Sequence, residues 1–331
     1  MASPFPTSSS APGEGNLVVD VMPQKISGLS TMTFQYPLKL ISPSPTSYQK
    51  SVLVFLLTYG GGLVGGDQVN LKIMVKKTSK LSIVTQGHTK IFKSPSPDIV
   101  TRQKLQVMIE SGAALCLLPD PVQPFQFSAY EQSQIFDVAD AGSLCLLDWV
   151  SAGRTARGED WDFWKWSGRN EVWAASEVGR KRRLLLRDNV FLNAQEMNDE
   201  DRDHSVRRKM QGLGIFGTLV LRGPLMEKLA LFFLEEFAAL PRIGSRDFRS
   251  QDMKDKDSSL VLSPQEAWRK QRLRQEALDG VLWSAAKVRG CTVIKFGTCT
   301  VEGGRVWIGG MIKQEGSISE KFGEDAIMCI R

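Results

Sequence analysis

The sequence predicts a mainly β protein with two to three α-helices in its C-terminal half. Between Leu17 and about Val150, apolar residues follow the period of a strand, and helical spacing is absent. Two helical patterns appear, and both lie beyond residue 223. A chain of 331 residues, of which 42% are hydrophobic, is long and apolar enough to bury a proper core.

The clearest strands are expected near residues 69–75 and 105–109. An apolar residue stands at every second position: Val69, Leu71, Ile73 and Val75 in the first, and Leu105, Val107 and Ile109 in the second. This period is typical of a half-buried sheet. The apolar runs Val52–Leu57 and Leu144–Leu147 are bounded by turn-forming residues, which predicts strands buried on both faces.

The first helix is predicted from Pro224 to Leu240, where Pro241 ends it. Its apolar stripe contains Leu229, Phe232, Phe233, Phe237 and Leu240. Because this stripe is too wide for a helix that faces solvent, we expect it to pack into the body or against a partner. Phe232, Phe233 and Phe237 are therefore the candidate partner-binding residues.

The second helix is predicted to begin at Ser263 and to continue to about Val288. The Ser263 hydroxyl can accept a hydrogen bond from the Glu266 amide, while the Glu266 carboxylate reaches back to the Ser263 amide. Pro264 between them suits the first helical position.

One domain is expected over residues 16–331, after a disordered tail at 1–15 that is rich in Ser, Pro, Ala and Gly. Two polar segments, at about 198–209 and 242–259, are predicted to be mobile surface loops because they contain few large apolar residues.

Composition excludes several function classes. No apolar run approaches the roughly 18 residues of a membrane-spanning helix, so no membrane segment is expected. The net charge of +6 is modest, and its two basic runs, 180–183 and 207–209, fit a solvated turn or an acidic partner as well as nucleic acid. Five scattered cysteines without paired spacing favour the cytoplasm over a disulfide-forming compartment.

Two glycine-rich segments imitate nucleotide-binding motifs. Gly212, Gly214 and Gly217 form G-x-G-x-x-G, but a polar run precedes them and a strand-like run follows, so we interpret them as the entry to a strand. Gly60–Asp67 lacks the Lys and the Ser or Thr of a phosphate loop. It is either a plain tight turn between strands or a turn that presents the Asp67 carboxylate, and the residues alone leave both readings open.

Catalytic and metal-binding patterns are missing from the sequence. It has no G-x-S-x-G elbow, and only His88 and His204 could serve as a histidine base. It also lacks C-x-x-C and a histidine pair at helical spacing, so no closed metal site is expected. Carboxylates remain candidates for weak, exchangeable metal ligands.

Six short strings follow one another along the chain: Tyr36–Lys39 (YPLK), Gly60–Asp67 (GGGLVGGD), Thr85–Phe92 (TQGHTKIF), Leu118–Phe125 (LPDPVQPF), Gly153–Glu159 (GRTARGE) and Leu184–Asp188 (LLLRD). In their order, and for the first three also in spacing, they resemble the UreD family of urease accessory proteins, also called UreH. The similarity is strong from Phe34 to Asp188 and looser around Gly212–Pro224 and at Lys321–Glu324. His88, where many relatives have a small residue, and the segment 242–259 depart from the family pattern.

The resemblance implies a β-rich body with a helix-like winding of strands, whereas general packing rules predict a β-sandwich. It also implies a non-catalytic scaffold that binds UreF, which recruits the GTPase UreG, and that docks on apo-urease. Nickel(II) is expected to pass transiently through an internal passage, with no tightly bound cofactor.

Asp67, Glu159 and Glu171 are the candidate residues of this nickel passage. An internal carboxylate costs several kcal/mol unless it is paired, hydrated or bound to a cation, and a wet passage would provide that compensation. The alternative for each residue is an ion pair with an arginine such as Arg154, Arg157 or Arg169. Two other functions remain as alternatives: a β-rich hydrolase or nucleotide-dependent enzyme, and a nucleic-acid binder, for which the basic runs lack interleaved aromatic residues.

Overall fold

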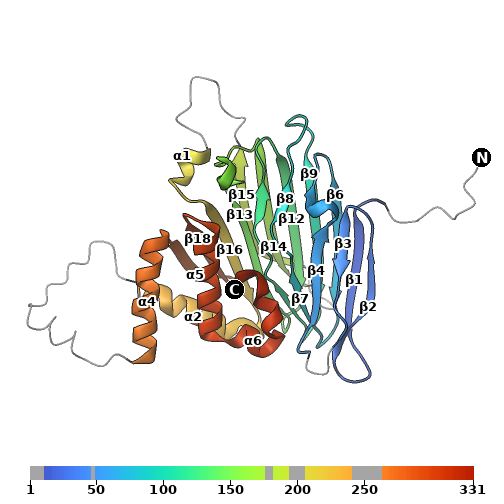
Figure 1. Cartoon of the computed structure of the whole chain (residues 1–331). Coiled ribbons are helices and arrows are strands. Elements are labelled where there is room, and N and C mark those ends of the chain that lie inside the picture. Colours follow the sequence, from blue (N-terminus) through green and yellow to red (C-terminus); the bar gives the residue numbers. More distant parts are fainter. Residues whose placement is uncertain (1–10, 46–48, 176–181, 194–205, 241–262) are drawn as a thin grey trace, which may run out of the picture.

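The computed structural model describes residues 11–45, 49–175, 182–193, 206–240 and 263–331, and it is built on two large sheets (Figure 1). The first sheet has seven strands in the order β15-β14-β12-β9-β6-β1-β2. Their bounds are β1 Glu14–Val21, β2 Ser27–Phe34, β6 Gln68–Val75, β9 Thr101–Ile109, β12 Ala129–Val138, β14 Lys165–Ala174 and β15 Arg183–Asn193.

The second sheet has eleven strands, eight of which follow the path β17-β18-β16-β13-β10-β7-β4-β3. These are β3 Leu38–Ile41, β4 Val52–Thr58, β7 Lys80–Val84, β10 Ala114–Leu117, β13 Ser143–Ser151, β16 Ile215–Arg222, β17 Leu282–Val288 and β18 Cys291–Thr298. Three short strands branch from this path: β5 Gly62–Leu63, β8 Thr89–Ile91 and β11 Val122–Pro124.

The chain winds between the two sheets in successive turns. Strands β6, β9 and β12 enter the seven-stranded sheet, and each is followed by a strand of the other sheet, β7, β10 and β13 respectively. Neighbouring turns therefore pair in parallel, as β6 with β9, β9 with β12, β7 with β10, and β10 with β13. The wound, β-rich body with a few helices is confirmed, and neither sheet closes into a barrel.

The predicted alternation is confirmed in the core between the sheets. Val69, Leu71 and Ile73 of β6 and Leu105 and Val107 of β9 are all buried there. The run 144–147 is buried on both faces, because alternate residues of β13 enter two different hydrophobic cores. The run 52–57 is strand β4, but its alternate residues are only half-buried, so burial on both faces is wrong for this strand.

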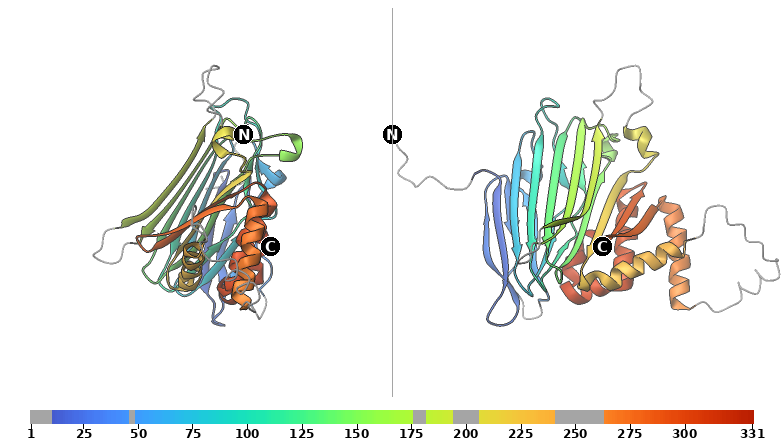
Figure 2. Two further views of the ribbon diagram at one scale, coloured as in Figure 1. Left: turned by 90° about the vertical axis from the view of Figure 1, so that its left-hand side faces the viewer. Right: turned by 180° about the vertical axis from the view of Figure 1, so that it is seen from behind.

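The second core lies between the eleven-stranded sheet and the helices, which cover its other face (Figures 1 and 2). The helices are α1 Val206–Met210, α2 Glu227–Ala238, α4 Pro264–Asp279, α5 Val301–Glu315 and α6 Ser317–Phe322. Single turns of 3-10 helix are η1 Tyr59–Gly61, η2 Thr155–Arg157, η4 Pro224–Met226 and the longer η5 Glu324–Ile330.

The first predicted helix is α2, preceded by the turn η4. Its stripe packs into the body of its own chain, since Leu229 and Phe233 are fully buried and Phe232 and Phe237 are half-buried. The Phe233 ring lies 6.3 Å from the Trp283 ring and 6.3 Å from the Trp307 ring, measured between centroids.

The second predicted helix, α4, begins with the expected reciprocal cap between Ser263 and Glu266. Its predicted end near Val288 is wrong. The helix ends at Asp279 because Gly280 adopts the left-handed conformation (φ 62°), and residues 282–288 form strand β17. Helices α5 and α6 were not predicted by any helical pattern.

Three boundary predictions change or lie outside the described residues. Strand β1 begins at Glu14, so the last two residues of the predicted tail belong to the sheet. Residues 206–209 of the predicted loop 198–209 form part of helix α1, while 198–205 lie outside the described residues. The segment 242–259 lies entirely outside them. Gly212 and Gly214 precede strand β16 and Gly217 lies within it, so this G-x-G-x-x-G segment is the predicted entry to a strand.

Candidate functional site

Four of the family-like strings lie at the same corner of successive turns of the winding. Gly60–Asp67 contains β5, Thr85–Phe92 contains β8, Leu118–Phe125 contains β11, and Gly153–Glu159 follows β13. The short strands pair in parallel, β5 with β8 and β8 with β11, so these segments lie side by side in space. We call this region the motif corner.

Close approach explains why Gly62, in the string Gly60–Asp67, has no side chain. A Cβ atom on Gly62 would stand 2.7 Å from the Lys90 carbonyl oxygen and 2.6 Å from the Phe92 ring. Both separations are below any normal contact distance, so a side chain here would push β5 away from β8. Both interpretations of this segment require a turn between strands, and the segment connects β4 to β6 through η1 and β5.

Asp67 stabilises this turn. Its carboxylate accepts a hydrogen bond from the Val64 amide at 2.9 Å, and its own amide donates to the Val64 carbonyl oxygen at 3.0 Å. The side chain is half-buried. The carboxylate is thus held by a backbone amide at the motif corner, and a role in a nickel passage stays a prediction.

Glu159 pairs with Arg154, as the alternative interpretation required. The carboxylate accepts from the Arg154 amide at 2.9 Å, from Nε at 3.0 Å and from Nη2. Burial raises the pKa of Glu159, but the Arg154 hydrogen bonds outweigh it and hold the pKa below its ordinary value. The Arg154 guanidinium also lies 3.9 Å above the Phe125 ring, and this contact joins the string Gly153–Glu159 to the string Leu118–Phe125.

Asp120, which sequence reasoning did not single out, connects the motif corner to the helices. Its carboxylate accepts from the Thr85 hydroxyl at 3.0 Å, from the Gly87 amide at 2.9 Å and from the Arg305 guanidinium of α5. The residue is 6% exposed. His88 lies beside the same guanidinium, and burial lowers its pKa. The charged and hydroxyl-bearing residues inside the strings LPDP and TQGH could have indicated this site in the sequence.

Glu171 lies away from the motif corner, on the outer face of the seven-stranded sheet. Its carboxylate accepts from Arg187 Nε at 2.9 Å and from Trp173 Nε1 at 2.9 Å, while Arg169 approaches to 3.7 Å. The structure therefore places Asp67 and Glu159 in the same corner and Glu171 elsewhere. Arginines balance the charges of both glutamates.

A layer of polar side chains crosses the core between the two sheets. Asp148 of β13 accepts from Gln132 Nε2 at 2.9 Å and from Asn170 Nδ2 at 2.6 Å, both on the facing sheet. Gln134 donates to Asn170 Oδ1 at 3.0 Å. Burial raises the pKa of Asp148, the amide hydrogen bonds lower it, and nearby Asp188 raises it again, so that the net shift is upward.

The polar layer continues toward the edge between β15 and β18. Strand register places Asp148 opposite Thr218, and Thr218 opposite Lys295. Asp188 of β15 accepts from Lys295 Nζ at 2.6 Å and from the Thr218 hydroxyl at 3.0 Å. Exposure rises along the layer, from 2% for Asn170 to 39% for the Lys295 side chain, so the layer leads from the core to solvent.

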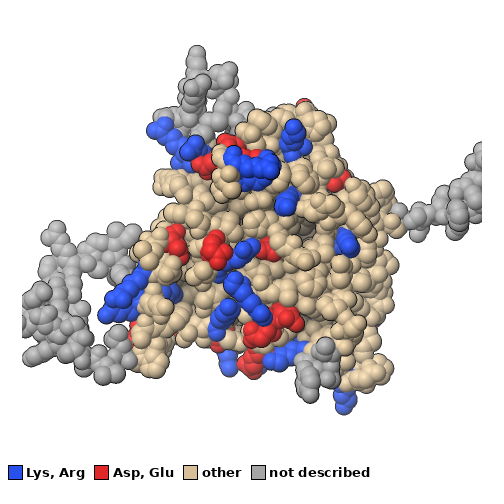
Figure 3. All heavy atoms as spheres, in the orientation of Figure 1, with Lys and Arg blue, Asp and Glu red and all other residues tan. Residues whose placement is uncertain are grey.

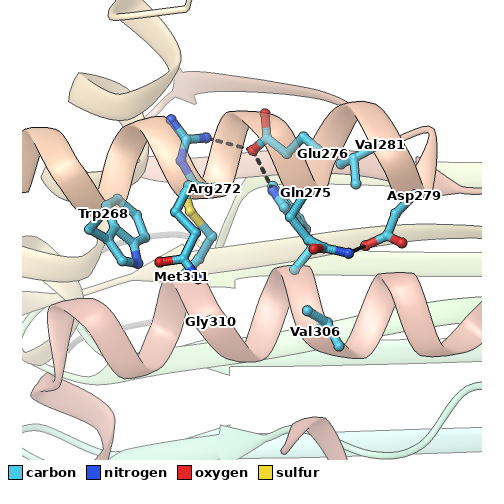
Figure 4. A pocket seen from close by; sticks show the side chains of 11 residues that line it. Trp268, Arg272, Gln275, Glu276, Asp279, Val281, Val306, Gly310 and Met311 are labelled. Carbon is cyan, nitrogen blue, oxygen red and sulfur yellow. Dashed lines mark hydrogen bonds and ion pairs between the residues drawn. The ribbon is translucent and has the colours of Figure 1, made fainter. Parts of the chain in front are cut away.

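The groove between α4 and α5 is the third feature with functional potential. It encloses about 250 Å³ and is lined by Trp268, Arg272, Glu276 and Trp307 (Figure 4). Glu276 accepts from Arg272 Nη1 at 2.6 Å and from Trp307 Nε1 at 2.8 Å. Glu236 of α2 also accepts a hydrogen bond from Arg272, so these side chains connect α2, α4 and α5.

The phenylalanines proposed to bind a partner lie in this helical layer. Phe233 is enclosed by its own chain, so its ring is not available to a partner. Phe232 packs on Trp268 and Phe237 on Trp283, at centroid distances of 5.7 and 5.3 Å. Both remain half-buried, and a role for them at a partner interface stays a prediction.

Within the described ranges, no three His, Cys, Asp or Glu side chains group in a way that could hold a metal ion. Nor is any helix in that part of the chain long and apolar enough to cross a membrane. The fold and these features define a class: a wound β scaffold with a helical layer on one sheet and hydrogen-bonded polar groups in its interior.

Comparison with known proteins identifies the family. The model of the UreD urease accessory protein family matches residues 11–326, and the chain belongs to this family of urease accessory proteins. It is 32% identical over 295 residues to an uncharacterized UreD-like urease accessory protein of Schizosaccharomyces pombe, which covers 88% of this chain and 90% of that protein. It is 41% identical over 189 residues to the urease accessory protein UreD of Sorangium cellulosum, covering 57% and 54%. It is 31% identical over 214 residues to urease accessory protein D of Arabidopsis thaliana, covering 63% and 69%.

Proposed function

We propose that this protein is a non-catalytic scaffold of urease maturation in the cytoplasm. It binds UreF, which brings the GTPase UreG, it docks on apo-urease, and it assists the insertion of nickel(II) into the urease active site. Membership of the UreD family supports this role, and the interior of the protein supports the part that concerns nickel.

The polar layer is the observation that carries the nickel proposal. Asp148 and Asp188 supply two carboxylates to this layer, within a sheet pair whose core is otherwise largely apolar. Side-chain amides contact Asp148, and the Thr218 hydroxyl contacts Asp188. Oxygen ligands of this kind bind a borderline divalent cation weakly enough to release it again. The raised pKa of Asp148 reflects a buried carboxylate that a cation would stabilise.

Asp67 and Glu159 keep a place in this proposal at the motif corner. Asp67 is held by one backbone amide, and its half-buried carboxylate retains acceptor capacity. Glu159 is already satisfied by Arg154, so a passing cation would have to displace the guanidinium. Glu171 is held in the same way by Arg187. Among the three, Asp67 is the residue whose carboxylate a cation reaches at lowest cost.

Replacing Asp148 with asparagine tests the nickel route. The change removes one negative charge and nearly preserves shape, and Asp137→Asn on the outer face serves as the matched control. In a strain that lacks the native protein, we expect Asp148→Asn to lower nickel per urease active site, measured by elemental analysis, while UreF, UreG and urease still co-purify. Normal nickel content together with normal assembly would remove Asp148 from the route.

A deletion strain tests the scaffold role itself. We expect urease activity to be lost while the urease subunits remain present, because the missing component is the metal and not the polypeptide. Full activity at ordinary nickel concentration in the deletion strain would contradict the proposal.

A further inference from the structure

The outer face of the seven-stranded sheet carries no described helix. Helices α2, α5 and α6 pack on β7, β16, β17 and β18 of the other sheet. In the view from behind, the blue-to-green strands face the viewer with no helix across them (Figure 2). Parallel strands are usually covered on both faces, and β6, β9, β12 and β14 pair in parallel, so their uncovered outer face suits a surface that a partner covers.

A groove crosses this outer face. It encloses about 540 Å³ over β6, β9, β12, β14 and β15. Strand register aligns one row of side chains along it, Asn70, Lys104, Ser133, Arg169 and Asn189. A second hollow of about 320 Å³ continues over β1 and β2 and shares Asn70 with the first.

The groove is basic. Four basic side chains and one acidic side chain line it: Arg102, Lys104, Lys165, Arg169 and Glu131. Glu131 is occupied by Arg102 at 3.0 Å and Lys165 at 2.5 Å, so its charge is already balanced. Lys104 is exposed and forms no ion pair within the described residues. The helix-bearing face differs, because acidic and basic side chains alternate there (Figure 3).

One aromatic ring borders the groove. The Phe191 side chain is 54% exposed, and the Lys165 ammonium lies 5.7 Å from its centroid. An exposed ring next to a row of amide, hydroxyl and basic side chains matches a polypeptide that brings both carboxylates and an apolar residue.

We propose that this groove binds an extended acidic segment of a partner protein. Five strands spaced about 4.8 Å apart give the row a length of about 19 Å, which corresponds to roughly six residues of extended chain. The carboxylates of the segment meet Lys104 and Arg169, and an apolar side chain packs on Phe191. The inference deepens the proposed function, on which it rests for the identity of the partner, a component of the urease maturation complex.

A nucleic acid fits the same groove less well. Sequence-independent binding of single strands uses several aromatic rings on which successive bases stack. The groove offers the single ring of Phe191, and Glu131 lies among the basic side chains that line it. Its amide and hydroxyl groups instead resemble those that pair with the backbone and side chains of a peptide.

Peptide binding to the full-length protein tests the chemistry. The probe is a fluorescein-labelled nine-residue peptide with five glutamates and one tyrosine, compared with the same peptide carrying glutamine in place of glutamate. We expect the glutamate peptide to bind and the glutamine peptide not to. The variant K104E/R169Q should lose about tenfold in affinity, while the control K313E/R274Q on α5 and α4 should bind as the wild type does.

Equal binding of the glutamate peptide to both double variants would overturn the proposal. Tighter binding of a nine-nucleotide oligothymidylate that is lost in K104E/R169Q would also overturn it, in favour of a nucleic-acid site. Unchanged melting temperatures of the variants ensure that a loss of binding reports on the groove.

Crosslinking in the reconstituted complex identifies the segment. Benzoylphenylalanine at Asn189 in the groove, with Gln314 on α5 as the control position, is irradiated in the presence of UreF, UreG and urease. We expect the Asn189 position to capture a peptide rich in Asp and Glu. Capture of a peptide without acidic residues, or none, sinks the inference.

Complementation distinguishes the two proposals. If wild-type protein does not restore urease activity in the deletion strain, the proposed function fails. If the wild type restores it and K104E/R169Q restores it equally with the same co-purifying partners, the groove inference alone fails.

Discussion

Replacing Glu236 with glutamine should strongly destabilise the helical layer. The Glu236 side chain is 1% exposed, and it accepts from Arg269 Nη2 at 2.6 Å, Arg269 Nε at 2.9 Å and Arg272 Nη2 at 3.0 Å. The Arg272 side chain is itself only 6% exposed. Removing one partner of a buried ion pair leaves an uncompensated charge and costs about 3–5 kcal/mol.

Glutamine keeps one acceptor oxygen, so the lower end of that range, about 3 kcal/mol, is the expected loss. The unfolding entropy of about 2.1 cal/mol/K per residue gives about 1.4 °C per kcal/mol for a chain of 331 residues, so the melting temperature should fall by about 4 °C. Thermal unfolding followed by far-UV circular dichroism at pH 7 measures it. Glu235→Gln is the matched control, because Glu235 is exposed and adjacent.

The pH dependence gives a second measurement on the same residue. Burial raises the pKa of Glu236, but the hydrogen bonds from Arg269 outweigh it, so the folded-state pKa lies below the ordinary 4.5. The stabilisation is fully present above pH 4.5 and is lost as the pH falls through the lower folded-state value. Glu236→Gln should lack this acid-dependent part. A melting temperature within 2 °C of the wild type, or an unchanged acid dependence, would refute the reasoning.

Three further predictions address the corner and the helical layer. Asp67→Ala removes only the hydrogen bond from the Val64 amide, which contributes about 1 kcal/mol, so the protein should stay folded and assembled. A lower nickel content per urease active site, measured by elemental analysis, would place Asp67 on the nickel route. Phe233→Asp puts a carboxylate into a fully enclosed ring site and should abolish soluble protein in an expression assay, whereas Leu231→Asp, at a 55% exposed position, should remain soluble. Glu159→Gln should lower the melting temperature at pH 7 and remove the part of the stability that the wild type loses below pH 4.5, because the folded-state pKa of Glu159 is lowered; identical acid titrations of both proteins would contradict this.

Sequence patterns predicted those elements whose structure is determined by residues close together in the chain. Strands β6 and β9 alternate strictly, so their buried faces followed from the period of the strand. The cap of α4 required only Ser263 and Glu266, which lie three residues apart. In both cases the interacting residues are close in sequence, and the physics that selects the structure is local.

The polar layer could not be predicted, because strand β12 carries polar residues on both faces. In β12, Gln132 and Gln134 point into the core, while Glu131 and Ser133 point outward, so hydropathy does not distinguish the faces. The partner that makes the inner face suitable for burial, Asp148, comes from the opposite sheet. That pairing depends on the winding, which the family resemblance implied and the period of the strands did not.

Helix α5 escaped prediction because glycines occupy its buried face. Glycine disfavours helices by about 1 kcal/mol relative to alanine, and α5 contains four of them. At Gly309 a Cβ atom would lie 1.8 Å from the Ile330 carbonyl oxygen, so the C-terminal turn η5 can reach the helix only if this residue lacks a side chain. Packing between distant segments thus outweighs local propensity here.

Stability alone does not explain the polar layer. Well-packed apolar side chains in place of buried charged or polar groups are often equally or more stabilising, so a core needs no such layer to fold. Here two rows of polar residues satisfy each other across the sheets, with Asp148 and Asp188 among them, and they reach solvent near Lys295. Within each row the members hydrogen-bond to one another, and strand register places Asp148 of one row opposite Thr218 of the other, so a change in one member leaves its neighbours unsatisfied. An interior arranged in this way gives up apolar burial for carboxylate, amide and hydroxyl groups, and the proposed passage of a divalent cation rests on these groups.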